Sequence, residues 1–594
     1  MGVPGFFSWL LKNYQKNKII SYQIDGDVDI LYIDANCAFH PQCFKVLGHY
    51  KNSLSLEKLE NKMIKRIINF LIYLIGFVNP KKEVYIAVDG VAPMAKINQQ
   101  RKRRYKTVID NVQRNEINSK YDKEVIDVWN NTTITPGTSF MEKLHQKLVQ
   151  FIKSNELELN IKYTYSSYHT IGEGEHKILQ DIRSKVHDNK DDIYVIYGLD
   201  ADLFFLSMGS QKNNIYLLRE ELFSKSKVHN EDDDFMFNIL TDVTEDLNYV
   251  SVDETKDCIN SHFHKVIRDK LEDPHKELND NYINDFIILC FLLGNDFLPN
   301  IPSLNIKHNG LNFIINIYVS IHIQTNEFLL VNKEINYKFF TSLIKEISMF
   351  EENYFLKIYP KYQEANLKRK CSSNDPYDIE IWKIDNLKNI DTSDQPKNVG
   401  QCDPLEWKYD YYYYYFKTSN NHSQHVNDVC HQYLKGIIWT IHYYFDKCIS
   451  YEWQYPYFCA PFISDFHHYL VPNKNNQTIN NDINKVKVFQ KDTLVITPLV
   501  QLLAVIPPQY NKILPYKYIK LMESQNSPIL DYFPTHVKLD YLYKDVLYKC
   551  MPFIPNVNME EFCQAVKGIS HDKKEIERNQ LLDNIVFNFM SSLN

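Results

Sequence analysis

Residues 84–105 read VYIAVDGVAPMAKINQQRKRRY, an apolar strand pattern that leads through Asp89 into a strongly basic helix pattern. The run VYIAV is typical of a strand buried on both faces, and Pro93 stands where a helix begins. Four polar side chains recur at helical spacing and are expected on one face: Lys96, Gln100, Arg103 and Arg104. A basic run is also typical of a solvated patch or a nuclear import signal. Its position after a strand that ends in a carboxylate favours a face that binds a compact anion.

Strand and helix patterns alternate over the first 300 residues. The strand patterns are DILYIDAN (29–36), VYIAVDG (84–90), IKYTYSS (161–167) and DIYVIYGLDADLFFL (192–206), with a helix expected near 57–78. Short apolar strands separated by helices predict an α/β fold with a mostly parallel, twisted sheet flanked by helices. The pattern turns helical from about residue 311, which predicts a second, mainly helical region. Ligands of such sheets bind beyond the carboxyl ends of the strands.

Length and composition indicate a large folded protein of more than one region. The 594 residues exceed a single core, and 44% hydrophobic residues with 42 Tyr and 34 Phe supply ample surface to bury. We expect a first region at 1–360, a polar linker or insertion at 361–404, and a second region at 405–594 that closes the site. The net charge of −7 argues against a broadly basic surface but allows a local basic pocket.

Several short patterns favour packing over special chemistry. The 11 scattered cysteines fit reduced thiols, so we expect a cytoplasmic protein, with the nucleus and a virion as alternatives. CAFHPQC (37–43) lacks a fourth ligand for zinc, and no signal peptide is visible. The longest apolar run, IINFLIYLIGFV (67–78), is too short to span a membrane and predicts a core helix. The tyrosine run at 409–416 predicts packing more than RNA stacking, because consecutive side chains point in different directions.

Acidic residues follow the predicted strands. Segments that we interpret as strands reach Asp34, Asp89, the pair Asp200 and Asp202, and Asp296, the last after DFIILCFLLGND (285–296). GEGEHKI (172–178) adds Glu173 and Glu175, and in an extended backbone each such pair would point the same way. If all converge, their repulsion requires divalent cations, and oxygen ligands favour Mg²⁺ or Mn²⁺. The pattern predicts a metal-dependent phosphodiesterase; acidic caps on an ordinary α/β domain are the alternative.

Motifs along nearly the whole chain resemble, in order, the Xrn family of 5′-to-3′ exoribonucleases. In the first region they are MGVPGFFSWL (1–10), DILYIDANCAFH (29–40), DGVAPMAKINQQRKRRY (89–105), PGTSFM (136–141), GEGEHKI (172–178), YGLDADL (197–203), LREE (218–221) and GNDFLPNIPSL (294–304). In the second they are EWKYDYYYYYF (406–416), YLKGIIWTIHYYF (433–445), YEWQYPYFCAPFISD (451–465), PLVQLLAVIPP (498–508), NSPILDYFP (526–534) and MPFIP (551–555).

The resemblance implies a PIN- or flap-nuclease-like core and a set of site residues. It implies that two Mg²⁺ or Mn²⁺ ions are held by Asp34, Asp89, Glu173, Glu175, Asp200, Asp202 and Asp296. It implies that Lys96, Gln100, Arg103 and Arg104 hold the 5′ monophosphate of single-stranded RNA. His40 would stack on the terminal base, with an aromatic of the second region opposite; we prefer Trp453 over Trp439. The expected activity is processive 5′-to-3′ hydrolysis to mononucleotides by a monomer with no membrane contact.

Departures and alternatives accompany this resemblance. The family usually has Lys where Gly5 stands and Gly or Ser where Cys37 stands, and neither replaces a ligand. The chain ends soon after MPFIP, so we expect a short form, and its Asn, Lys, Ile and Tyr content suggests a large DNA virus or a protist. One alternative is a flap-type structure-specific DNA nuclease. The other is an inactive protein that binds RNA 5′ ends as a scaffold, which the seven intact acids argue against.

Overall fold

The computed structural model describes most of the chain. The described residues are 6–14, 16–125, 128–185, 190–220, 238–388, 390–391, 395–396, 403–417, 420, 422–471, 489 and 492–590. Among them, no helix is long and apolar enough to cross a membrane. The run at 67–78 belongs to the core helix α4 (Leu56–Val78), as predicted.

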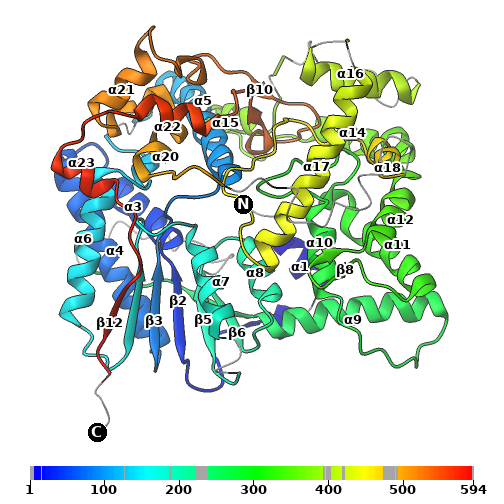
Figure 1. The fold of residues 1–594 in the computed structure, drawn as a ribbon, viewed down its shortest axis with the longest axis horizontal. Helices are drawn as coiled ribbons and strands as arrows, with labels where there is room; N and C mark the ends of the chain where they lie inside the picture. Colours follow the sequence, from blue (N-terminus) through cyan, green and yellow to red (C-terminus); the bar gives the residue numbers. More distant parts are fainter. Residues whose placement is uncertain are drawn as a thin grey trace.

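One mixed sheet of eight strands organises the first region (Figure 1). Its order is β1 (Ile20–Ser21), β7 (Leu247–Ser251), β6 (Ile215–Glu220), β5 (Tyr194–Tyr197), β2 (Ile30–Asp34), β3 (Glu83–Ala87), β4 (Lys162–Ser166) and β12 (Ile585–Asn588). The five strands from β6 to β4 are parallel, and β1, β7 and β12 pair antiparallel with their neighbours. The chain winds outward from β2 to β4 and then returns to pair β5 with β2. This reversal creates the switch point at which ligands of such sheets bind.

Alternate side chains of the central strands pack into two separate hydrophobic cores, one on each face of the sheet. Leu31 and Ile33 of β2 pack into a core with α3 (Ala35–Tyr50), α4 and α6 (Ser139–Ser154). Ile30 and Tyr32 pack on the opposite face with α7 (Gly174–Lys185), α8 (Asp202–Gly209), α9 (Val252–Leu271) and α10 (Ile283–Phe291). Because successive side chains of a strand point to opposite faces, a strand covered on both sides is apolar throughout. The predicted α/β sheet flanked by helices is confirmed.

The second region is mainly helical, and its C-terminal part reaches back to the first. It contains α16 (Pro404–Phe416), α17 (His422–Phe445), α18 (Ile463–Leu470), α20 (Pro498–Val505), α21 (Tyr516–Glu523), α22 (Met559–Val566) and α23 (Lys573–Arg578). α20 packs on α5 (Met94–Lys120), the predicted basic helix, and β12 extends the sheet beside β4. Of the tyrosine run, Tyr411, Tyr412 and Tyr414 are buried, which fits the packing interpretation, while Tyr409 and Tyr413 are exposed.

Two local expectations from the sequence differ from the structure. DFIILCFLLGND forms helix α10 and not a strand; α10 is buried almost all round, so its apolar run carries no period that separates helix from strand. The described part of the polar segment 361–404 contains most of α14 (Tyr359–Lys368) and α15 (Pro376–Asp385). α15 packs on α5, where Tyr377 donates a hydrogen bond to Asn118 Oδ1 at 3.0 Å. The predicted boundaries at 360 and 404 stay predictions.

Candidate active site

Four of the predicted carboxylates lie at the carboxyl ends of the central strands. Asp34 is the last residue of β2, and Asp89 follows the end of β3. Asp200 and Asp202 follow β5, and Asp202 is the first residue of α8. Asp34 and Asp202 are buried, whereas Asp200 is exposed. β2 and β5 are neighbours in the sheet, so these acids flank its switch point.

The other three predicted carboxylates come from helix ends. Glu173 directly precedes α7, Glu175 lies in its first turn, and Asp296 follows α10. The expectation that each acidic pair lies on extended backbone is therefore wrong for Glu173 and Glu175, and likewise for the pair that ends at Asp202. Both pairs stand where a helix begins, a place where the free backbone N–H groups favour negative charge.

A glycine lets α7 approach the strand ends closely. The Gly174 N–H donates to Asp89 Oδ1 at 2.7 Å, and Asn36 Nδ2 donates to Asp89 Oδ2 at 2.9 Å. A Cβ added at Gly174 would lie 3.0 Å from Asp34 Oδ1 and 3.1 Å from the Ala87 carbonyl oxygen. Only a residue without a side chain fits there without displacing a carboxylate. Gly174 and Asn36 thus position acids that the sequence pattern identified, although it did not single out these two residues.

Burial and mutual repulsion hold several of these carboxyls toward their protonated forms. Burial, and next the charge of Asp89, raises the pKa of Asp34 to about 8. Burial, and next the charge of Asp296, raises the pKa of Asp202 to about 7. Burial likewise raises the pKa of Glu175 well above its usual range. Like charges that are brought together away from water disfavour ionisation, so a nearby cation would stabilise the ionised form of these carboxylates.

Lys96 of α5 supplies part of that charge. Its Nζ lies 2.7 Å from Glu173 Oε1 and 3.0 Å from Asp296 Oδ2, and the side chain is buried. Burial alone would lower the pKa of Lys96, but the carboxylates raise it well above its usual range. Burial opposes ionisation of Asp296, yet Lys96 holds the pKa of that carboxyl below its usual range. The basic helix and the acidic set are therefore in direct contact.

The donor chemistry of the acidic set suits divalent cations. Glu175 Oε2 and Asp202 Oδ1 are buried and have no hydrogen-bond partner among the described residues. Buried carboxylate oxygens normally have partners, and oxygen-only ligands favour Mg²⁺ or Mn²⁺. Within the described ranges, no three His, Cys, Asp or Glu side chains form a finished metal site. Lys96 lies between two of these carboxylates, Glu173 and Asp296. The oxygen donors of the acidic set suit such ions in their chemistry, and the role of the acids as metal ligands stays a prediction.

The basic run of α5 divides between two faces of the helix. Arg104 Nη2 donates to Thr135 Oγ1 at 2.8 Å, while its buried Nη1 lacks a partner among the described residues. Arg103 is exposed, and its charge acts on both Asp296 and His40. The opposite face carries Arg101, which donates to the Ala504 carbonyl oxygen at 2.7 Å and to that of Tyr532.

Gln100 and Lys102, the remaining polar residues of this run, also lie in different surroundings. Gln100 is buried, and its Oε1 has no partner in the described part of the chain. Lys102 lies over the ring of Phe458, 4.6 Å from its centroid. Arg101 and Lys102 thus anchor α5 to the second region, whereas the predicted stripe lies on the face with the acids. The motif contains structural and candidate substrate-binding residues side by side.

The two residues expected to stack on a base differ in setting. His40 is half-buried, and burial with the charges of Arg103 and Arg104 lowers its pKa to about 4, so it is a neutral ring beside the basic stripe. Trp453 is only 8% exposed and packs on Trp439, with ring centroids 5.1 Å apart. Trp439 is fully buried. Both tryptophans belong to the core in this structure, so its geometry gives no support to stacking by either ring.

Three more residues near the acids lie in motifs that the sequence pattern did not connect with the site: Tyr443 and Tyr451 of the second region and Lys177 of the first. Tyr443 of α17 donates a hydrogen bond to Glu173 Oε2. Tyr451 is half-buried, and Glu173 is among the charges that raise its pKa. Lys177 of α7 is buried and donates to the carbonyl oxygens of Val88 at 2.7 Å and Ser167 at 2.9 Å. The motifs contained all three residues, but only the folded chain brings Tyr443 to the carboxylates.

Comparison with known proteins agrees with this architecture. A family model described as the XRN 5′-3′ exonuclease N-terminus matches residues 1–221, and one described as the Xrn1 helical domain matches 277–401 and 385–593. The human 5′-3′ exoribonuclease 1 is 28% identical over 98% of this chain and 35% of its own length. The 5′-3′ exoribonuclease 2 homolog of Drosophila melanogaster is 26% identical over 99% of this chain and 73% of its own length.

The first of these relatives is much longer than this chain. The 5′-3′ exoribonuclease 1 of Saccharomyces cerevisiae is likewise matched over 99% of this chain, at 25% identity, but over only 45% of its own length. The chain therefore spans between about a third and three quarters of the relatives compared here. Family models that cover both regions, together with the shared order of motifs, establish that the chain belongs to the Xrn family.

Proposed function

We propose that this chain is a 5′-to-3′ exoribonuclease that degrades single-stranded RNA with a 5′ monophosphate and releases 5′ mononucleotides. The observation that carries the proposal is the contact between Lys96 and the carboxylates of Glu173 and Asp296. It joins an acidic set suited to divalent cations to a helix face suited to a terminal phosphate. The names of the relatives support the same activity, and the PIN- or flap-nuclease-like nature of the sheet is part of the proposal.

The substrate-binding role rests on α5 and His40. Arginine offers several N–H donors in a planar fork, which suits the several oxygens of a terminal phosphate. Arg104 has one buried nitrogen without a partner among the described residues, and Arg103 is exposed beside it. His40, neutral at pH 7, offers a ring that would stack on any base, as degradation of many sequences requires. The 5′ end would thus be held while the first phosphodiester lies over the acids.

The hydrolytic role rests on the seven carboxylates. Two Mg²⁺ or Mn²⁺ ions, when bound, would activate water and stabilise the leaving oxygen. The residues that would hold them are Asp34, Asp89, Glu173, Glu175, Asp200, Asp202 and Asp296. Asn36 and the Gly174 N–H fix the Asp89 carboxylate, and Tyr443 fixes Glu173. These contacts fix the orientation of the two carboxylates against the repulsion between neighbouring acids, which would otherwise turn them apart.

The substrate preference can be tested with RNA of one sequence and three different 5′ ends. The protein with Mg²⁺ is incubated with 5′-monophosphate, 5′-hydroxyl and 5′-triphosphate RNA, and released mononucleotides are measured. We expect the monophosphate RNA to be degraded at least tenfold faster than the other two. The 5′-hydroxyl RNA lacks the phosphate that would accept the bonds from α5, and the two additional phosphates of the triphosphate RNA would have to fit into a site of monophosphate size. Equal rates for all three would refute the role of α5 in phosphate recognition. Cleavage of a 5′-flap DNA in preference to RNA would favour the flap-nuclease alternative.

A pair of variants on one helix tests the role of the acids. α7 carries Glu175 at its start and Asp181 at its other end, where Asp181 accepts hydrogen bonds from Tyr32 at 2.9 Å and from Lys185 at 2.6 Å. Glu175→Gln should lower hydrolysis by at least 10²-fold while RNA binding persists, because a metal ligand is lost. The matched control Asp181→Asn should retain activity within about fivefold. Full activity of Glu175→Gln would contradict the ligand role. A wild type that binds 5′-monophosphate RNA without hydrolysing it would instead favour the scaffold alternative.

A further inference from the structure

A cavity of about 310 Å³ lies away from the candidate active site, and none of its lining residues is a candidate site residue. Its walls are the segment 303–310, the start of α11 (Gly310–Thr325), the end of α12 (Tyr337–Ser348) and the segment 350–358. Most of its lining is apolar, including Leu304, Phe313, Ile347, Phe350 and Ile358. A volume near 300 Å³ with mainly apolar walls is typical of a binding pocket for a small group.

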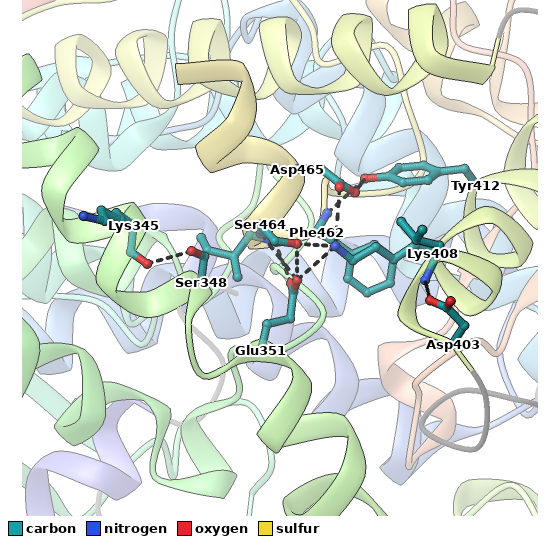
Figure 2. Close-up of polar contacts among 11 residues, drawn as sticks. Lys345, Ser348, Glu351, Asp403, Lys408, Tyr412, Phe462, Ser464 and Asp465 are labelled. Carbon is teal, nitrogen blue, oxygen red and sulfur yellow. Dashed lines mark hydrogen bonds and ion pairs between the residues drawn. The ribbon is translucent and has the colours of Figure 1, made fainter. Parts of the chain in front are cut away.

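One wall of the cavity is fixed by a buried polar network (Figure 2). The Glu351 carboxylate accepts hydrogen bonds from the Ile463 N–H at 2.8 Å and from the Ser464 hydroxyl, and Lys408 Nζ lies 3.6 Å away. These contacts tie α13 (Glu351–Asn353) to α18 and α16. Because its carboxylate is already satisfied, Glu351 leaves no free negative charge for a ligand. The wall that contains Glu351 is held in place by these contacts, and a ligand would meet its shape more than its charge.

The polar groups of the cavity are neutral, and one lacks a partner. Ser303 is 8% exposed, and its hydroxyl has no hydrogen-bond partner among the described residues. His308 Nδ1 lies 2.8 Å from the Tyr354 hydroxyl, and its ring stacks on Tyr362 at 3.7 Å between centroids. Burial, and next the charge of Lys549, lowers the pKa of His308 to about 4, so the ring is uncharged at pH 7. A ligand with one hydrogen-bonding group on an apolar body would satisfy this wall.

The rim of the cavity has features of an interaction surface. Residues Tyr354–Ile358 form a π-helix, a rare conformation that is frequent at functional sites. Phe350, which lines the cavity, is 45% exposed, and two apolar side chains close to it in sequence are also exposed: Met349 at 62% and Leu356, within the π-helix, at 50%. Exposed apolar side chains next to a pocket are typical of a contact site.

Basic residues are frequent in the chain next to the cavity. From residue 357 to 370 the chain carries Lys357, Lys361, Lys368, Arg369 and Lys370 against a single acid, Glu364, which pairs with Lys368. On the other side, Lys307 and Lys549 share one carboxylate, Asp545, at 3.3 and 2.6 Å. Both lysines act on His308, so their charge reaches the cavity. A partner with acidic residues around its anchor would complement this surface.

We propose that this cavity binds a tryptophan or tyrosine side chain carried by an acidic segment of a partner protein. Such a side chain combines an apolar body with one polar tip, and it is enriched among the residues that dominate interfaces. The body would fill the apolar walls, the polar tip would bond the Ser303 hydroxyl, and the flanking acids would meet the lysines. This inference does not depend on the proposed nuclease activity.

The proposal can be tested with a synthetic probe and three variants of the full-length chain. The probe is a heptapeptide of glutamate and aspartate with one central 5-fluorotryptophan, followed by ¹⁹F NMR so that the protein's own tryptophans do not interfere. Phe350→Ala removes an exposed part of the rim, and Ser303→Leu fills the cavity. Leu405→Ala, an exposed apolar residue of α16, is the matched control. Melting temperatures establish that each variant is folded.

We expect binding with a Kd on the order of 100 μM, as suits one buried anchor. Phe350→Ala and Ser303→Leu should weaken it at least tenfold, and Leu405→Ala should leave it unchanged. Replacing the tryptophan of the probe by alanine should abolish binding, and raising NaCl from 50 to 500 mM should weaken it several-fold. Equal binding of the alanine peptide, or undiminished binding to both cavity variants, would overturn the proposal. Binding of free adenosine at this site, with none of the peptide, would overturn it in favour of a small-molecule pocket.

Discussion

Two buried lysines near the carboxylates provide a sharp test of the acidic set. Lys96 contacts carboxylates, whereas Lys177 contacts only backbone carbonyl oxygens. Replacing either lysine by methionine removes two hydrogen bonds, each contributing about 1.5 kcal/mol, the lower end for a charged donor; this lower value suits Lys177, since burial lowers its pKa to about 7. We expect each variant to lose about 3 kcal/mol in EDTA. A chain of this length changes its unfolding free energy by about 1.2 kcal/mol per degree near the midpoint, so the loss corresponds to ~2–3 °C in Tm.

Only one of these losses should be reversed by divalent cations. Lys96→Met leaves Glu173 and Asp296 without their cation, so Mg²⁺ meets no competing ammonium there. Mg²⁺ at 100 times its Kd stabilises a protein by about 2.7 kcal/mol, which would restore most of the lost Tm. Lys177→Met should gain no more from Mg²⁺ than the wild type does. Differential scanning fluorimetry in EDTA and in Mg²⁺ measures both quantities. If Mg²⁺ raises the Tm of the two variants equally, Lys96 does not neutralise metal-binding carboxylates.

Three further results are expected. Tyr443→Phe removes the hydroxyl that holds Glu173, so kcat on 5′-monophosphate RNA should fall about tenfold, as a misplaced reacting group costs up to 10²-fold, while Tm falls by only ~1–2 °C for one lost hydrogen bond to a charged group. Arg101→Met should lower Tm by ~2–3 °C in thermal denaturation, because two carbonyl oxygens lose a charged donor, and the preference for 5′-monophosphate RNA should persist. In EDTA, the Tm of the wild type relative to that of the double variant Asp34→Asn/Asp202→Asn should fall as pH rises from 4 to 8, because burial raises the pKa values of Asp34 and Asp202 to about 8 and about 7, so these two groups hold more protons in the folded than in the unfolded chain; a relative Tm that rises with pH would contradict those shifts.

The sequence predicted a strand or helix correctly where its residue pattern is compatible with only one of the two. VYIAV is apolar at every position, and the structure buries all of Glu83–Ala87 as a central parallel strand. The basic helix after Pro93 begins at Met94, as the proline indicates. DFIILCFLLGND was misassigned because α10 is buried almost all round, so nothing polar marks its helical period.

The candidate site was harder to predict where it depends on contacts distant in sequence. Six of the seven acids could be found because each follows a strand or stands where a helix begins; Asp296 follows helix α10, which the sequence pattern took for a strand. Tyr443 could not be distinguished from its neighbour Tyr444 in YLKGIIWTIHYYF, because only the packing of α17 against α7 and α8 decides which hydroxyl reaches Glu173. Trp453 was preferred for stacking by its motif, yet the same motif packs it on Trp439. Motif membership identifies the region of a site more reliably than the orientation of each ring.

The division of the basic run explains why its charge density is a poor guide to its function. Arg101 is fully buried and holds α20 through the Ala504 carbonyl oxygen, so its charge serves the joint between the two regions. Lys96, five residues earlier, neutralises acids from α7 and from the chain after α10. α5 therefore fixes the second region on one face and borders the carboxylates on the other. Both faces belong to one helix, so the joint between the two regions and the stripe beside the acids share one backbone. Within the proposed mechanism, this coupling would keep the 5′ phosphate at a constant distance from the acids, which is what removal of one nucleotide at a time requires.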